Sequence, residues 1–290
     1  SELPGYLSMT LSYDVNTGKA APYSALTIVS TAAWGLGYFG MPHILLRFMA
    51  IEDEKKLKLS RRVATIWVVI SLFVAVFIGV IGYTMSKVGA LEMLTGSNSE
   101  TIIVKISALL SQHGVIFALL AGVILAGILA STMSTSDSQL LAASSAVSSD
   151  ILGAFRKDSS NKNGSMAAAR ITLLVISVVA AFIARNPDSS VFAIVSFAWA
   201  GFGAAFGPVV LFSLFWKRTS KWGALAGMVC GGSMVFIWKY LIRPLGGIWN
   251  IYELLPAFRI ACAAIVIVSL LPPKPSKEIE EEFDLVAQMK

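Results

Sequence analysis

Seven long apolar segments occupy most of this 290-residue chain. A helix that crosses a bilayer needs about 20 apolar residues, and only helices and closed barrels satisfy every backbone hydrogen bond in lipid. We expect membrane-spanning helices at residues 22–49, 62–86, 114–150, 167–184, 190–216, 222–242 and 254–272. The sequence therefore predicts an all-α polytopic membrane protein with about seven transmembrane helices.

The few charged residues of the chain carry information about its orientation. Only 14% of residues are charged, and connections rich in Lys and Arg alternate with connections that are poor in them. Basic connections lie preferentially in the cytoplasm. We predict an extracellular loop at 1–21, a transmembrane bundle at 22–272 and a cytoplasmic tail at 273–290, in a plasma or inner membrane. The net charge of +6 is then a topology signal and does not indicate a nucleic-acid partner.

No pattern in the sequence favours enzymatic chemistry. Cys230 and Cys262 each lie within an apolar run, which is typical of buried thiols and not of a disulfide or metal framework. Metal-ligand spacing, a nucleotide-binding loop and a nucleophile–base pattern are absent. We therefore expect no enzyme and no cofactor. The chain starts at Ser1 without a signal pattern, and we interpret it as a piece of a longer protein.

The first apolar segment carries a cluster of helix-breaking residues. Its centre reads Trp34-Gly-Leu-Gly-Tyr-Phe-Gly-Met-Pro42, with three glycines and a proline that disfavour a continuous helix. Interrupted helices mark binding sites near the membrane midplane in secondary transporters. Trp34 and Tyr38 would then form aromatic walls of such a site. A kinked helix with its aromatic residues in the interfacial belt is the alternative.

The third apolar segment changes from apolar residues to a run of hydroxyls and one acid. Ser131, Ser134, Thr135 and Ser138 fall within about 100° of one another on a helix surface, and Asp137 flanks them. A carboxylate within an apolar helix costs about 2.5–3.5 kcal/mol on insertion scales, so it normally faces a polar interior. We favour an ion site. Alternatively, the hydroxyls bond carbonyls one turn earlier or join neighbouring helices.

Small residues dominate the fifth apolar segment, and two further short helices are expected outside the seven spans. The fifth segment contains Trp199 and closely spaced glycines up to Gly207-Pro208, which predicts a close helix approach and a hinge or kink at the proline. Residues 100–112 are interpreted as an interfacial helix, and the tail from Lys277 as a short cytoplasmic helix.

Three stretches in the same order resemble the sodium/solute symporter family, most of all its proline-transporting branch. They are Trp34–Ala50, Ser134–Leu141 and Ala198–Leu211. The resemblance implies the second inverted repeat of a leucine-transporter-type fold plus two C-terminal helices. The first repeat, in the N-terminal half of the same protein, would lie outside this chain.

The same resemblance implies a sodium site on the hydroxyl-bearing helix. Ser134 and Thr135 would supply side-chain oxygens and Ser131 its backbone carbonyl, since that position is commonly Ala in the branch. Asp137 falls where some relatives have Ser, so a direct role for its carboxylate is a separate hypothesis. Sodium would act as the coupling ion, without a further cofactor.

A solute pocket is implied by the first stretch. Trp34, Tyr38 and Pro42 would match positions that line the proline pocket, whereas Phe197 replaces a Tyr of close relatives. The implied function is sodium-coupled uptake of L-proline by alternating access, with the lipid bilayer, sodium and proline as partners. A symporter for another amino acid, a monocarboxylate, a vitamin or a sugar is an alternative. A seven-span receptor or a symporter-derived sensor also remains open.

Overall fold

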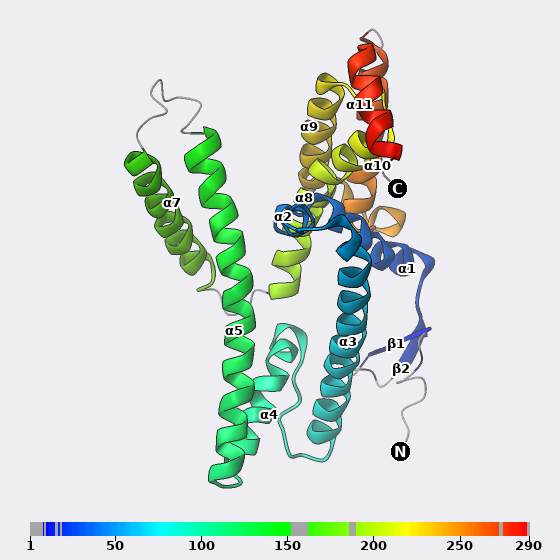
Figure 1. Cartoon of the computed structure of the whole chain (residues 1–290). Helices are drawn as coiled ribbons and strands as arrows, with labels where there is room; N and C mark the ends of the chain where they lie inside the picture. Colours follow the sequence, from blue (N-terminus) through cyan, green and yellow to red (C-terminus); the bar gives the residue numbers. More distant parts are fainter. Residues whose placement is uncertain are drawn as a thin grey trace. The chain divides into compact units, whose positions relative to one another are not determined.

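The structure is a computed structural model that describes residues 8, 10–14, 17, 19–151, 162–185, 190–272 and 275–288. It is mostly helical within these ranges (Figure 1). The described part contains five helices that are long and apolar enough to cross a membrane, at Leu57–Lys87, Val115–Ser148, Met166–Ile183, Val191–Phe215 and Lys221–Leu245. A polytopic membrane protein is therefore confirmed in outline. Two compact units are formed, Ser1–Leu45 with Val195–Lys290, and Leu46–Ile194.

Within its described residues, the unit Leu46–Ile194 is formed by helices and the connections between them. Its elements are η2 (Glu54–Lys56), α3 (Leu57–Lys87), η3 (Gly96–Thr101), α4 (Ile102–Ser111), α5 (Val115–Ser145), the π turn η4 (Ala146–Ile151) and α7 (Lys162–Ile183). Gly82 of α3 allows α4 to approach closely, because a Cβ at that position would overlap the side chain of Ile102. The helix expected within 100–112 is present as α4.

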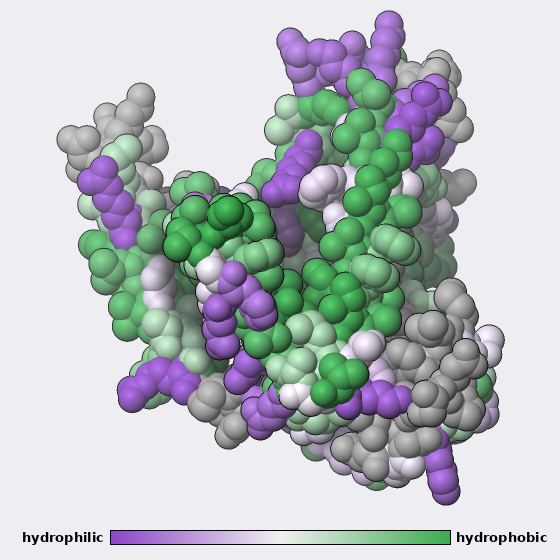
Figure 2. Space-filling model, turned by 90° about the horizontal axis from the view of Figure 1, so that it is seen from below, coloured by the Kyte–Doolittle hydropathy of each residue, from purple (hydrophilic) through white to green (hydrophobic). Residues whose placement is uncertain are grey.

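Apolar side chains cover the outer surfaces of these helices. The most apolar 18-residue windows of α3 and α7 contain no buried residue. Hydrophobic residues cover much of the face seen in Figure 2, and hydrophilic residues gather in separate groups. Exposed apolar surface of this extent is typical of helices that lie against lipid or other protein, and it exceeds what a soluble monomer normally exposes.

The N-terminal segment contains a β-hairpin that the sequence did not predict. Strands β1 (Leu11–Asp14) and β2 (Lys19–Pro22) pair antiparallel, with Leu11 opposite Pro22 and Asp14 opposite Lys19. Only a loop was expected at 1–21, because each strand has four residues and neither shows clear alternation. The Asn-Thr-Gly stretch between the strands is a signal that indicates a hairpin connection.

The first apolar segment is interrupted, as predicted. It consists of α1 (Ala25–Ala32), the 3-10 helix η1 (Ala33–Gly40) and α2 (Pro42–Met49). Ser24 caps α1 by accepting a hydrogen bond from the Thr27 amide at 3.1 Å. Met41 is extended (φ −86°, ψ 112°), the conformation that a following proline imposes. The backbone therefore changes helix type at Ala33 and leaves helical geometry at Met41.

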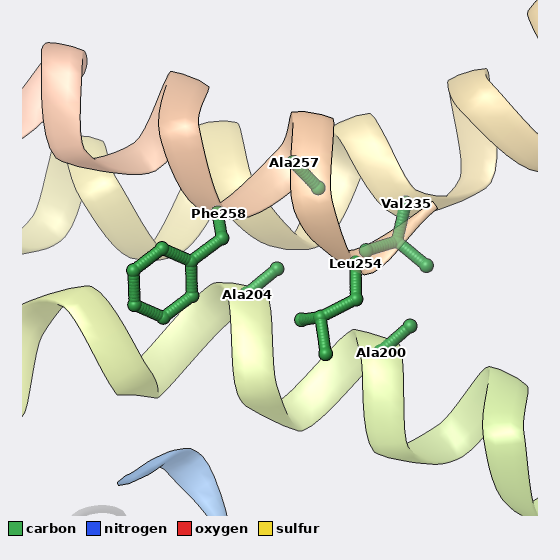
Figure 3. Packing of buried hydrophobic residues seen from close by; sticks show 6 residues of the cluster. All are labelled: Ala200, Ala204, Val235, Leu254, Ala257 and Phe258. Atoms are coloured by element: carbon green, nitrogen blue, oxygen red, sulfur yellow. The ribbon is translucent and has the colours of Figure 1, made fainter. Parts of the chain in front are cut away.

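The C-terminal part forms the packed core of its unit. It contains α8 (Val191–Phe215), α9 (Lys221–Ile237), η5 (Trp238–Ile242), η6 (Arg243–Leu245), η7 (Gly247–Trp249), α10 (Leu254–Leu270) and α11 (Lys277–Gln288). Helices α8, α9 and α10 meet around a cluster of buried side chains from all three (Figure 3), namely Ala200, Ala204, Val235, Leu254, Ala257 and Phe258. The predicted tail helix is present as α11. Helix α10, with 17 residues, corresponds to the seventh predicted span.

Three glycines of α9 determine how closely it packs. A Cβ at Gly223 or Gly227 would overlap Ser269 or Ile265 of α10, and one at Gly231 would overlap the carbonyl of Ala204 in α8. Residues spaced four apart lie on one helix face, and small residues there let backbones approach. Helix α8 continues through Pro208, which has no N–H to donate to the carbonyl of Ala204 four residues earlier. Gly231 of α9 lies beside this same carbonyl.

Candidate functional site

The 3-10 segment η1 lies directly against the backbone of α8. A Cβ at Gly37 would overlap the indole of Trp199, and one at Gly40 would overlap the carbonyl of Phe202. From the other side, a Cβ at Gly203 would come within 2.7 Å of the Gly37 Cα. Glycine is therefore required on both surfaces, and the predicted close approach of the fifth segment is confirmed here.

Four aromatic rings form a cluster around this contact. The rings of Trp34 and Trp199 stack with centroids 5.3 Å apart, and those of Trp34 and Tyr252 stack at 6.1 Å. Tyr38 meets Trp199 edge to face at 4.8 Å. These separations lie in the range in which aromatic pairs contribute beyond simple burial. Trp34 is thus engaged by two rings, while Tyr38 remains 50% exposed.

Three hydrogen bonds fix the cluster to the surrounding backbone. The indole N–H of Trp199 donates to the carbonyl of Trp34 at 3.0 Å. The hydroxyl of Tyr252 donates to the carbonyl of Ser196 at 2.6 Å, and its backbone N–H donates to the hydroxyl of Ser30 at 3.1 Å. Burial, followed by the nearby carboxylate of Glu253, raises the pKa of Tyr252, so this phenol stays a donor at neutral pH.

Phe197 of α8 faces a different set of residues. The ammonium of Lys239 lies 3.7 Å from the centre of its ring, and Phe236 meets that ring edge to face at 5.2 Å. A ring in contact with a cation is stabilised by the negative face of its π system. Phe197 therefore links α8 to the end of α9.

The hydroxyls on α5 are bonded within their own helix. Ser131 donates to the carbonyl of Ile128 at 3.3 Å, Thr135 donates to the carbonyl of Ser131 at 3.3 Å, and Ser138 donates to that of Ser134 at 2.9 Å. This is the bonding to preceding carbonyls that the sequence left as an alternative. Ser131, Ser134, Thr135 and Asp137 are all exposed in this chain.

The same geometry places two oxygen atoms of α5 close together. Two oxygens that each lie about 2.3–2.6 Å from a hard cation, with an oxygen–cation–oxygen angle of about 90°, are about 3.3–3.7 Å apart. The hydroxyl oxygen of Thr135 and the carbonyl oxygen of Ser131 are separated by 3.3 Å. Hydroxyl and carbonyl oxygens are the type of ligand that hard cations prefer, although this separation is also that of an ordinary hydrogen bond within a helix. These residues belong to the unit Leu46–Ile194, whereas Trp34, Tyr38 and Pro42 belong to the other unit.

An ion pair that no sequence motif indicated holds the connection before α10. Arg243 donates to the carboxylate of Glu253 at 2.8 Å and to the side-chain oxygen of Asn250 at 3.0 Å. The side chain of Glu253 is only 2% exposed, and a buried carboxylate is stable when it is paired in this way. The available signal was an acid at the start of an apolar run, ten residues after an arginine.

A second acid joins the connection before α4 to the start of α8. Glu100 accepts hydrogen bonds from the hydroxyl of Ser190 at 2.7 Å and the amide of Val191 at 3.1 Å. The bond from Ser190, joined by those from the amides of Val191 and Phe192, holds the pKa of Glu100 below its usual value. Residues 90 positions apart are thereby held together within the unit Leu46–Ile194.

Comparisons with known proteins show which family the chain belongs to. The family model described as the sodium:solute symporter family matches residues 8–231. The chain is 41% identical over 261 residues to the sodium/proline symporter of Haemophilus influenzae, 39% over 259 residues to that of Escherichia coli, and 37% over 266 residues to the osmoregulated proline transporter of Bacillus subtilis. These alignments cover 89%, 89% and 92% of this chain and 51%, 50% and 52% of the relatives. The chain thus spans about half the length of these curated relatives. No solved structure matches it.

Proposed function

Because this chain belongs to the sodium:solute symporter family, we propose that the complete protein takes up L-proline together with sodium by alternating access. The observation that carries this proposal is the identity of about 40% to sodium/proline symporters over 89% of the chain. The interrupted first segment supports it further, since broken helices form the binding sites of secondary transporters. The apolar helices and the family together make the chain part of an integral membrane protein.

In this proposal, the chain supplies the second inverted repeat and two C-terminal helices. The broken segment, α3, α5, α7 and α8 would form the repeat, and α9 and α10 would follow it. The first repeat lies in the missing N-terminal half, which would cover polar and apolar surface that this chain exposes. Residues 1–21 would lie outside the cell and residues 273–290 in the cytoplasm, because the basic connections then face inward.

The solute would bind beside the broken segment. Trp34 is partly exposed and Tyr38 is 50% exposed, so these two aromatic rings would offer surface to a small apolar ring. Pro42 is exposed and begins the second half of the broken helix directly after Met41. The pyrrolidine ring of proline has the size and polarity that such an aromatic surface accepts.

Sodium would bind at Thr135 and Ser134 with the carbonyl of Ser131, and with oxygens from the missing half. Thr135 would rotate its hydroxyl hydrogen away from the Ser131 carbonyl, so that both oxygens face the ion. Coupling then follows from linkage. An ion that binds one global state more tightly shifts the protein toward that state, and a solute that prefers the same state then binds with a higher apparent affinity. Asp137 would add negative charge near this site.

The test is uptake of radiolabelled L-proline by the full-length protein in proteoliposomes, with and without an inward sodium gradient. We expect accumulation only with the gradient, and competition by unlabelled proline. Sodium-dependent uptake of another amino acid, a monocarboxylate, a vitamin or a sugar, without uptake of proline, would show that the cargo is wrong. Absence of any sodium-dependent uptake would contradict the transport function itself.

A further inference from the structure

We infer that Tyr252 and Trp199 are positioning residues, which hold the broken segment so that Trp34 and Tyr38 are presented to the solute. The inference rests on the proposed function for the meaning of that presentation. Tyr252 lies in the connection between the two C-terminal helices, so a residue outside the proposed repeat would shape the solute site.

Tyr252 ties three separate elements together. Its backbone N–H donates to Ser30 of α1, its hydroxyl donates to the carbonyl of Ser196 in α8, and its ring stacks on Trp34 of η1. The two hydrogen-bond partners lie 222 and 56 residues away in sequence. One residue therefore spans the point at which the first helix changes to 3-10 geometry.

The backbone of Tyr252 is itself held firmly. The next residue, Glu253, is buried and paired with Arg243, which also binds Asn250. Leu254, directly after it, is completely buried in the core of α8, α9 and α10. Tyr252 thus extends from a rigid part of the fold, and its ring cannot follow Trp34 if the broken segment moves.

Trp199 holds the broken segment from α8. Its indole N–H binds the carbonyl of Trp34, its ring stacks on Trp34, and it meets Tyr38 edge to face. Because Gly37 has no side chain, the indole of Trp199 lies directly against the backbone of η1. Any rotation of η1 would break the bond to Trp34 and separate both ring pairs together.

The contacts indicate a positioning role and not direct binding for Tyr252. Its hydroxyl and its backbone N–H are already used within the protein, and its ring lies on Trp34. Each hydrogen bond of this kind changes an equilibrium by about three- to tenfold. We therefore expect effects on solute affinity that pass through Trp34 and Tyr38.

The first test compares uptake kinetics of full-length variants in proteoliposomes. Tyr252→Phe removes one hydroxyl and should raise the KM for proline about three- to tenfold. Tyr252→Ala also removes the stacked ring and should raise it further, so that Phe restores part of what Ala loses. Trp199→Phe should raise KM about three- to tenfold, with the maximal rate per inserted molecule within about twofold of wild type.

Tyr240→Phe is the matched control, because Tyr240 precedes the same connection and is 60% exposed. It should leave KM unchanged. A KM that stays at the wild-type value for both Tyr252→Phe and Trp199→Phe would overturn the inference. A lower maximal rate with an unchanged KM would also overturn the inference, because that result indicates a purely structural role. These two variants decide the matter if Tyr252→Ala fails to accumulate.

The second test does not depend on the cargo. Gly35 is exposed, and a Cβ built there would have no atom within 4 Å, so Gly35→Cys in a cysteine-free background reports on η1. We expect N-ethylmaleimide to alkylate this thiol several-fold faster when Trp199→Phe or Tyr252→Phe is added, and not with Tyr240→Phe. Unchanged rates would overturn the inference even if proline is transported. Faster rates in a protein that transports no proline would contradict only the proposed cargo.

Discussion

Replacing Gly37 by Ala tests the contact between the broken segment and α8. The new Cβ would overlap the indole of Trp199, so the ring or the backbone must move. Overpacking of this kind costs about 1–3 kcal/mol. Loss of the bond from Trp199 to the Trp34 carbonyl adds about 0.5–1.5 kcal/mol, and loss of the stacking adds about as much.

Gly35→Ala is the matched control, two residues earlier in the same 3-10 segment. No atom lies within 4 Å of a Cβ at Gly35, and neither glycine has a positive φ. Alanine there should be neutral or should stabilise by about 0.4–1 kcal/mol, because it restricts the unfolded chain. Allowing the same gain at Gly37, the net destabilisation of Gly37→Ala is about 1–6 kcal/mol.

The assay measures the thermal unfolding midpoint of the purified full-length variants in detergent. Size-exclusion chromatography after heating at each temperature reports the fraction that remains folded. At about 2–4 °C per kcal/mol, Gly37→Ala should lower the midpoint by several degrees, while Gly35→Ala leaves it level or slightly raised. Equal midpoints for the two variants would refute the close contact of η1 with Trp199.

Three further predictions follow from the sites described above. Ser134→Ala and Thr135→Ala should each raise the sodium concentration for half-maximal uptake about tenfold, as loss of one charge-assisted ligand predicts; unchanged sodium curves for both would remove them from the ion site. Trp34→Ala should raise the KM for proline about tenfold or more, since it removes both stacked ring pairs, and a normal KM would remove Trp34 from the solute site. The lowered pKa of Glu100 means that its contribution to stability is complete above the usual value of 4.5 and is lost as pH falls through the lowered pKa. Ser190→Ala should weaken this acid dependence of the thermal midpoint, and an identical pH profile would contradict the bond.

Much of this architecture follows from local features of the sequence. The apolar runs locate the helices because each crossing must bury about 20 residues of backbone in lipid. The interruption before Pro42 was predictable because glycine and proline act on the backbone of their own segment. The hydroxyl face of α5 was predictable from helical periodicity alone, whereas the oxygens that would complete the proposed ion site would come from other parts of the protein.

Only the tertiary structure decided which residues surround the broken segment. Tyr252 reads as an ordinary loop tyrosine, yet it bonds Ser30 and Ser196, because folding brings together positions far apart in the chain. The glycines of α9 likewise acquire their role only when α10 and Ala204 are placed against them. Periodicity and helix breakers act within one segment, and therefore they specify where each helix begins, ends or breaks. Partner choice depends on complementary shapes and hydrogen bonds between segments, which no single stretch of sequence contains.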